Sequence, residues 1–439
     1  MKQLLENLIK DWWTRPLPKI IPREFSLRDY ADLKVKKIVS VVGFRRSGKT
    51  YSLLELAKSL GQRNCVYINF EDERIPKETA VLTNLLEVIT ELSGNKPYFL
   101  LLDEIQNIPD WSLWVRRVNE TTAHRIFLTG SSSKLSSSNL PTELRGRSLT
   151  VSVSPLSFGE FLKFKGKDFS LLTQPQLLNL TREYLFYGGF PEIVLMEEGR
   201  KPLILDEYFQ TFLTRDVIER HNLKEKEAMK TLIQLLLNCS FFTISKLANS
   251  LKSLGLTVGK ATVARYLSFL EESFFLSSLY LHTPSLKNRL KAEKKPYFID
   301  SYFLSRYSTA FSQNLGKIME NVVYNQLLKI VQNDPFYQIY YWKDYQNHEV
   351  DFVVRRKEKV ENIIQVSFVS RRGEVNPREI RSLAVAAKVF KLKKALFITW
   401  DLEEEAKAPF GKIIFVPLYK WLVEGERWKL TLCENRQMS

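Results

Sequence analysis

The sequence is poor in cysteine and histidine, and it has no long apolar run. Its three cysteines lie far apart in a chain of 439 residues, which excludes a disulfide framework and a local thiolate metal site. The four histidines are equally scattered. No apolar run is long enough to span a bilayer, and the N-terminal segment mixes apolar with charged side chains instead of forming a signal-peptide core. These absences predict a cytoplasmic globular protein of two or three domains.

Acidic residues are in the minority, and their deficit is uneven. The chain carries 65 lysines and arginines against 49 acidic residues, a net charge of +16. Residues 1–220 contribute 31 basic and 27 acidic side chains, whereas residues 221–439 contribute 34 and 22. A basic C-terminal half is the electrostatic footprint of a nucleic-acid partner. Basic proteins without such a partner are common, so the charge makes DNA a candidate partner and does not decide the question.

The segment Gly43–Thr50 has the spacing G-x-x-x-x-G-K-T without a departure. The apolar run 37–42 before it predicts a buried parallel strand, and the leucine spacing of 51–60 predicts a helix. A glycine turn between a strand and a helix cradles phosphates with backbone N–H groups. The lysine then reaches the β- and γ-phosphates, and the next hydroxyl binds Mg²⁺. The expected cofactors are ATP and Mg²⁺, and the expected nucleotide-binding residues are Gly43, Arg45, Arg46, Ser47, Gly48, Lys49, Thr50 and Tyr51.

Two carboxylates, Asp103 and Glu104, end the apolar run 98–102. In a P-loop protein the first carboxylate supports the Mg²⁺ shell, so Asp103 is expected to be a metal ligand together with Thr50. The second orients and polarises the attacking water, so Glu104 is expected to be the general base, with Lys49 as a second catalytic residue. The alternative is a buried strand that happens to end in acidic residues, and the glycine loop upstream disfavours it.

Strands and helices alternate through the first 155 residues, which predicts a parallel α/β sheet with ligands at the carboxyl ends of its strands. Thr129 and Ser131 end one strand-like run, and either is expected to face the γ-phosphate as a polar sensor or only to cap the strand. Arg145 and Arg147 follow. Each is a candidate for a charge-stabilising arginine finger, supplied in cis or by a neighbouring chain in a homo-oligomer, or for a solvated loop arginine.

These motifs, with Gly146-Arg147 leading to the segment Ser154–Phe161, resemble a known group. This group consists of prokaryotic, largely archaeal AAA+-type ATPases that carry a C-terminal domain of unknown function. The resemblance extends over nearly the whole chain. It implies an ASCE-type P-loop sheet followed by a helical lid. A Gly188-Gly189 turn within the expected lid is also typical of the group.

The chain after the lid is predicted to form a winged helix-turn-helix. Helices expected near 229–238, 243–251 and 260–270 precede a strand-like run at 274–280. The segment 287–295 carries five cations and one anion, and we expect it to be an exposed wing tip that neutralises DNA phosphates. Because many winged helices contact only protein, a protein partner is the alternative.

The last part of the chain has the order α-β-β-β-α-β and resembles the PD-(D/E)XK nuclease fold. Glu320, Asp351 and Gln365 stand at the places of its metal-binding residues. In that family the third element is a carboxylate, a spacer and a lysine, whereas this chain has Gln365 and Ser367. These departures weaken divalent-metal binding and water activation, so the site is expected to be vestigial. A lysine from the following helix, such as Lys388, would restore part of it.

The favoured hypothesis is an α/β ATPase that couples Mg-dependent ATP hydrolysis to DNA binding by its C-terminal half. The alternatives are an ATP-responsive DNA-binding regulator, or a protein-docking switch, with little turnover. An active ATP-dependent nuclease is the least favoured. The expected domains are an ATPase core at 1–155, the lid at 156–223, the winged helix at 224–312 and the nuclease-like domain at 313–439.

Overall fold

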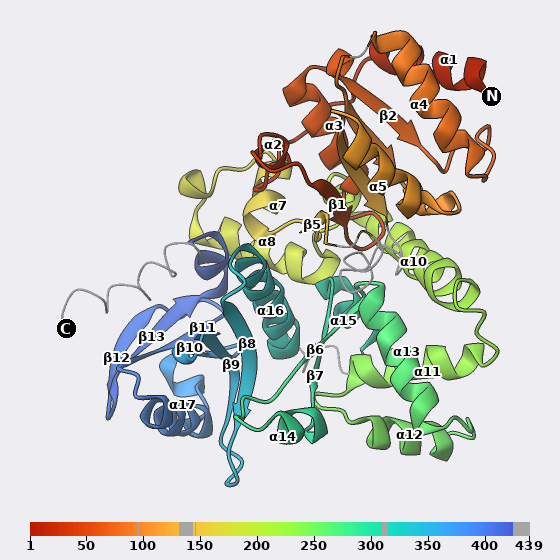
Figure 1. Ribbon diagram of the computed structural model, residues 1–439. Helices are drawn as coiled ribbons and strands as arrows, with labels where there is room; N and C mark the ends of the chain where they lie inside the picture. The colour runs from red at the N-terminus through yellow and green to blue at the C-terminus, as the bar shows by residue number, and fades with distance from the viewer. Residues whose placement is uncertain (95, 131–143, 145, 309–314, 425–439) are drawn as a thin grey trace. The chain divides into compact units, whose positions relative to one another are not determined.

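The structure is a computed structural model that describes residues 1–94, 96–130, 144, 146–308 and 315–424. The chain forms two compact units. One consists of Met1–Ser154 with Glu272–Phe274, and the other of Pro155–Glu271 with Phe275–Ser439. The first unit contains a parallel sheet, whereas the second combines many helices with a two-stranded and a six-stranded sheet (Figure 1).

Helices and strands alternate in the first unit, which confirms the predicted α/β class. Its elements are α1 (Lys2–Thr14), α2 (Arg28–Ala31), β1 (Ile38–Val42), α3 (Lys49–Leu60), η1 (Gln62–Asn64), β2 (Cys65–Asn69), α4 (Ala80–Ser93), β3 (Phe99–Asp103), η2 (Ile105–Asn107), α5 (Trp111–Thr121), β4 (Arg125–Gly130) and β5 (Ser148–Ser152).

The sheet of the first unit has the strand order β2-β3-β4-β1-β5, and all its pairs are parallel. β4 therefore lies between β1, which leads into the glycine loop, and β3, which ends in Asp103. All five residues of β1 are buried, as expected for a β-branched run covered on both faces. The carboxyl ends of β1, β3 and β4 meet at one edge, and this edge carries the candidate site.

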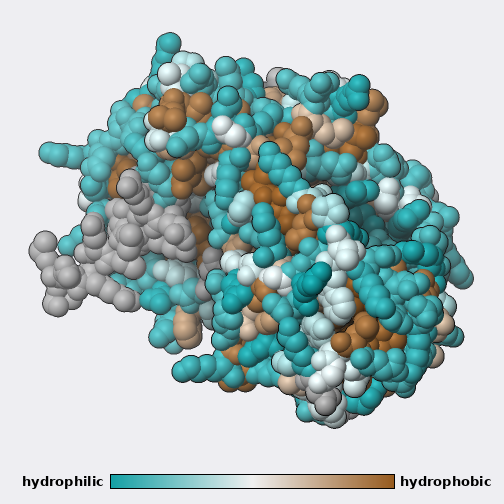
Figure 2. All heavy atoms as spheres, turned by 90° about the horizontal axis from the view of Figure 1, so that it is seen from above, coloured by the Kyte–Doolittle hydropathy of each residue, from teal (hydrophilic) through white to brown (hydrophobic). Residues whose placement is uncertain are grey.

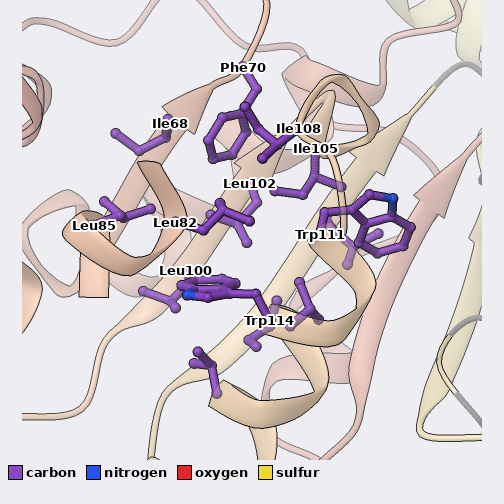
Figure 3. Close-up of a cluster of buried hydrophobic side chains, with 14 of the residues drawn as sticks. Ile68, Phe70, Leu82, Leu85, Leu100, Leu102, Ile105, Ile108, Trp111 and Trp114 are labelled. Carbon is purple, nitrogen blue, oxygen red and sulfur yellow. The ribbon is translucent and has the colours of Figure 1, made fainter. Parts of the chain in front are cut away.

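Helices cover both faces of this sheet. Figure 3 shows Leu82 from α4 and Trp114 from α5 gathered with Leu100 and Leu102 of β3 in one core. Leu101, between these two strand residues, belongs instead to a second core with α3. Because a slip of one residue would exchange the two cores, burial on both faces fixes the register that brings the strand ends together.

The second unit begins with a helical segment and ends with a mixed sheet. Its elements are α7 (Phe158–Phe164), η4 (Phe169–Leu171), α8 (Gln174–Tyr187), α9 (Pro191–Val194), η5 (Glu198–Arg200), α10 (Lys201–Thr211), the π-helix η6 (Phe212–Glu219), α11 (Lys226–Asn238), α12 (Ile244–Ser253), α13 (Lys260–Glu272), β6 (Leu276–Leu279), α14 (Leu286–Lys291), β7 (Lys295–Phe298), α15 (Ser301–Tyr307), α16 (Leu315–Asn333), β8 (Tyr337–Lys343), β9 (Glu349–Arg356), β10 (Lys359–Val366), η8 (Arg372–Glu374), α17 (Pro377–Phe390), β11 (Lys394–Thr399), β12 (Glu404–Ala408) and β13 (Gly411–Pro417).

The glycine turn after α8 is held by the start of α15. Asp300, the buried N-cap residue of α15, accepts hydrogen bonds from the backbone N–H of Gly189 at 2.8 Å and of Tyr302 at 2.9 Å. Gly188 has φ 72° and ψ −163°, a combination that is essentially restricted to glycine. A Cβ at Gly188 would lie 1.6 Å from Asp300 Oδ1. The turn therefore requires glycine for both backbone conformation and space.

Three helices and a hairpin follow in the order that the winged-helix prediction gives. α11, α12 and α13 precede β6, which pairs with β7 in antiparallel fashion. The expectation of an exposed wing tip at 287–295 is wrong at its C-terminal end. Helix α14 forms most of that segment, and Lys295 is buried in β7. A basic run marks charge, but it does not show which cations are solvated.

The six-stranded sheet has the order β12-β13-β11-β10-β9-β8, with β10, β11 and β13 parallel to one another and the other pairs antiparallel. The order α16-β8-β9-β10-α17-β11 is the α-β-β-β-α-β order that the sequence indicates. Leu383 and Ala387 of α17 pack with Val353 of β9 and Ile363 of β10 in the core of this part.

The described part of the chain contains no helix that is both long and apolar enough to cross a membrane. The face in Figure 2 is largely hydrophilic, with hydrophobic residues in separate patches. Leu171 and Leu203 are among the exposed apolar side chains, and single exposures of this kind are normal in a folded protein.

Candidate nucleotide site

The glycine loop between β1 and α3 depends on backbone conformations that glycine allows. Gly43 and Gly48 have φ of 152° and 103°, and Arg46 has φ of 66°. A Cβ at Gly43 would lie 2.2 Å from the carbonyl oxygen of Val153, so this position has no room for a side chain. The loop ends in Lys49, the first residue of α3, which places its N–H groups at a helix N-terminus.

The side chain of Lys49 is buried inside the loop. Its Nζ donates to the carbonyl oxygens of Gly43 and Phe44, each at 3.1 Å. Arg23, which sequence reasoning missed, supports the same loop from outside: its guanidinium donates to Ser47 O at 3.1 Å and Ser154 O at 2.9 Å. Among the other predicted loop residues, Ser47 is buried, Arg45 is partly exposed, and Arg46 and Tyr51 are exposed.

Asp103 is the centre of a hydrogen-bond network. Its Oδ2 accepts from the hydroxyls of Thr50 at 2.9 Å and Tyr67 at 2.8 Å, and its Oδ1 accepts from Thr129 Oγ1. Burial raises the pKa of Asp103, and these hydrogen bonds offset that rise only in part. The structure thus brings together Thr50 and Asp103, the two residues that the sequence assigns to the metal.

Glu104 follows Asp103 in the left-handed conformation, with φ of 52°. Its N–H donates to Thr129 Oγ1 at 3.0 Å, and its carboxylate accepts from Gln106 Nε2. Thr129 therefore contacts both acidic residues, because it lies near the end of β4, the strand that pairs with β3. Glu71, just after β2, is close enough to Glu104 to feel its charge. The pKa of Glu71 is raised by burial and, second, by the charge of Glu104.

Of the remaining predicted residues of the nucleotide site, the structure describes Arg147. Arg147 Nε pairs with Glu120 Oε1 of α5 at 2.6 Å, and both side chains are well exposed. The described partner of Arg147 is thus not a residue of the glycine loop. Ser131 and Arg145 lie outside the described residues.

Sequence reasoning missed Tyr67 and Gln106 because their roles depend on tertiary contacts. Tyr67 lies on β2, paired with Leu101 of β3, and its hydroxyl reaches Asp103 farther along the sheet. A tyrosine in an apolar strand predicts burial and gives no sign of a partner. Gln106 follows Glu104 by two residues, so only the turn of η2 shows that their side chains meet.

We expect Tyr67→Phe to weaken the network around Asp103. The change removes one of the two hydroxyls that Oδ2 accepts from, and a hydrogen bond to a charged group contributes about 1.5–3 kcal/mol. Urea denaturation should show a loss of that order in the free energy of unfolding. Tyr30→Phe is the control, since no hydrogen bond of the Tyr30 hydroxyl is seen within the described ranges. An equal loss in both variants would contradict the role of Tyr67.

The glycine loop, the Thr50–Asp103 pair and the parallel sheet form the arrangement of a P-loop nucleotide-binding domain. A family model described as an AAA domain matches residues 35–162. Two models described as domains of unknown function, DUF8612 and DUF4143, match residues 178–313 and 315–421. The combination expected from the resemblance, an AAA domain with a C-terminal domain of unknown function, is confirmed, while the nuclease-like fold stays a prediction.

The chain belongs to the same family as the uncharacterized protein MJ1544 of the archaeon Methanocaldococcus jannaschii. The two are 34% identical over 420 residues, which cover 92% of this chain and 91% of the relative. An uncharacterized protein of Haemophilus influenzae is 29% identical over 360 residues, with 80% and 87% covered.

Solved structures give looser similarities. The Walker-type ATPase PABY2304 of Pyrococcus abyssi superposes with a TM-score of 0.46 at 13% identity, covering 66% of this chain and 98% of that one. The Aeropyrum pernix ORC1 protein, solved in complex with DNA, gives a TM-score of 0.32 at 17% identity, covering 71% and 98%.

The three residues of the predicted nuclease-like site lie on three elements of the second unit. Glu320 of α16 and Asp351 of β9 meet at the ammonium of Lys295. Gln365 of β10 instead hydrogen-bonds Glu379 of α17, as Ser367 does. The lysine at this site is therefore Lys295 from β7, and the suggested Lys388 is exposed on α17.

Proposed function

We propose that this chain hydrolyses ATP with Mg²⁺ at the Gly43–Thr50 loop and couples the cycle to DNA binding by its second unit. One observation carries the first part. Thr50 and Asp103 are joined by a 2.9 Å hydrogen bond at the mouth of the glycine loop, and Glu104 is next in the chain. The strand order, with β4 between β1 and β3, supports the ASCE-type sheet that the resemblance implies.

The residues present fit Mg-ATP. The loop is tight enough to exclude a Cβ at Gly43, which suits close approach of backbone N–H groups to phosphate oxygens. A hydroxyl and a carboxylate are the hard oxygen donors that Mg²⁺ prefers, so Thr50 and Asp103 would hold the ion, directly or through its waters. When bound, Mg²⁺ neutralises charge on the β- and γ-phosphates.

Lys49 contributes the second positive charge at the phosphates. Its ammonium donates to the loop carbonyls of Gly43 and Phe44, and it must exchange these for phosphate oxygens. This exchange conserves hydrogen bonds and adds a charge–charge attraction, so phosphate binding is favourable.

Glu104 is the base in this proposal. Its carboxylate would accept a proton from the attacking water. Thr129 fixes the position of the Glu104 backbone by accepting its N–H, while it donates to Asp103. One hydroxyl thus hydrogen-bonds both the carboxylate of Asp103 and the backbone N–H of Glu104. The decisive experiment is Glu104→Gln, assayed for both ATP binding and phosphate release.

The DNA-binding part rests on charge and on the helix-hairpin arrangement. Lys260 and Arg265 are exposed on α13, and Lys287 and Lys291 are exposed on α14. We expect these cations to contact DNA phosphates, as the cations of a winged helix do. An ATP-responsive regulator is the second candidate. If DNA stimulates turnover, the coupled ATPase is favoured. If ATP only changes DNA affinity, the regulator is favoured.

We expect duplex DNA binding to weaken steeply with salt and to depend on α13. Each phosphate contact adds about 0.9 to the slope of log affinity against log salt, so Lys260→Ala with Arg265→Ala should reduce the slope by about 1.8. Fluorescence anisotropy between 50 and 200 mM salt measures this. The control pair, Lys167→Ala with Lys391→Ala, removes two exposed cations elsewhere in the second unit. Binding that ignores salt, or is absent, would favour a protein partner instead.

A further inference from the structure

Lys295 lies at the centre of a buried ionic cluster. Its Nζ is 2.8 Å from Asp351 Oδ1, 2.9 Å from Glu349 Oε1 and 3.0 Å from Glu320 Oε1. The Lys295 side chain is only 6% exposed. Glu320 and Asp351 accept hydrogen bonds from this ammonium, and Glu349 forms a third ion pair with it.

The carboxylates are themselves held in place. Glu320 Oε1 also accepts from the hydroxyl of Tyr297 at 2.5 Å, and Asp351 Oδ2 accepts from Val366 N at 3.0 Å. Burial works against a charged lysine, but the attraction of the carboxylates outweighs it and raises the pKa of Lys295. The three distances of 3.0 Å or less show that the ammonium is held between these carboxylates.

The cluster joins parts of the second unit that are distant in sequence. Lys295 belongs to the hairpin strand β7, whereas its partners come from α16 and β9. Carboxylate oxygens converging from two elements on one point are also the arrangement in which proteins hold divalent cations. In this chain the ammonium of Lys295 lies at that point.

We infer that the ammonium of Lys295 occupies the place of a divalent cation at Glu320, Glu349 and Asp351, so that the wild-type cluster excludes metal and serves as an internal tie. A divalent ion would have to displace a buried cation and leave that cation without its partners, which is strongly unfavourable. The cluster is consequently a latent divalent-cation site that the wild-type lysine closes. This inference does not depend on ATP hydrolysis.

The test is Lys295→Met, which keeps the length of the side chain and removes its charge. The buried carboxylate of Asp351 and the partly exposed ones of Glu320 and Glu349 then face one another without a cation. Without metal the variant should therefore melt below the wild type. With Mn²⁺ at about 100 times its Kd, its melting temperature should rise by about 5 °C, while that of the wild type should not. Calorimetric titration without nucleotide should show one additional Mn²⁺ per chain. The glycine loop is identical in both proteins, so any binding there cancels.

Two variants complete the design. Lys295→Met with Asp351→Asn should lose the response to Mn²⁺, because it lacks one of the three carboxylates. Asp351→Asn alone keeps the lysine, and its Mn²⁺ binding should equal that of the wild type even if Lys295→Met does not fold. Wild-type Mn²⁺ binding that Asp351→Asn abolishes would overturn the inference. A folded Lys295→Met protein without the additional Mn²⁺ would overturn it as well.

Discussion

Replacement of Glu104 by glutamine should lower the rate of ATP hydrolysis by about 10² to 10⁴, the usual contribution of a general base, without weakening ATP binding. Glutamine has nearly the same shape as glutamate but cannot accept a proton from water. The phosphate-binding groups and the Thr50–Asp103 pair are unchanged, and the backbone N–H of residue 104 still donates to Thr129. Phosphate release measures turnover, and titration with a fluorescent ATP analogue measures binding.

Two control variants separate the roles. Lys49→Ala should lose ATP affinity, because it removes the charge at the phosphates. Glu73→Gln changes an exposed acid that follows β2 and should leave turnover unaltered. If Glu104→Gln retains wild-type turnover, Glu104 is not the base.

The first unit was the more predictable one because its signals are local. The spacing of Gly43–Thr50, the β-branched run before it and the acidic end of β3 all lie within short segments. The position of Thr129 at the end of a strand, as a polar sensor or a strand cap, was predictable for the same reason. The contacts of Tyr67 and Arg23 depend on the packing of separate segments, so no local sequence pattern predicts them. Arg147 shows the converse: its place after a glycine suggested a finger, whereas its ion pair with Glu120 depends on α5.

The second unit shows which elements and contacts can be predicted from apolar periodicity and charge, and which cannot. The order of α16 to β11 follows from apolar runs. The edge strand β12, with the sequence Glu-Glu-Ala-Lys-Ala, is at most partly buried, so it carries little hydrophobic signal. Lys295 is the sharper failure. It lies in a basic run, and its carboxylate partners Glu320, Glu349 and Asp351 follow it by 25, 54 and 56 positions. Only the fold brings them together.

The glycine turn beside α15 gives the second large effect. Gly188→Ala should destabilise the second unit by about 3 kcal/mol or more, because a disfavoured backbone conformation costs about 1–3 kcal/mol and a lost N-cap about 1 kcal/mol. The added methyl group would meet Asp300 Oδ1 at 1.6 Å. Asp300 must therefore move, and it then loses its hydrogen bonds from Gly189 and Tyr302. Urea denaturation followed by circular dichroism measures the loss.

Gly199→Ala is the matched control for this change. Gly199 lies in η5 of the same unit, and a Cβ there would have no described atom within 4 Å. Its substitution should change stability by less than about 0.5 kcal/mol, as is usual at open surface positions. Equal stability of both variants would show that the turn can rearrange around a methyl group. A selective loss in Gly188→Ala, repeated in Asp300→Ala, would show that Asp300 and the turn stabilise the unit together, because each change removes the same two hydrogen bonds.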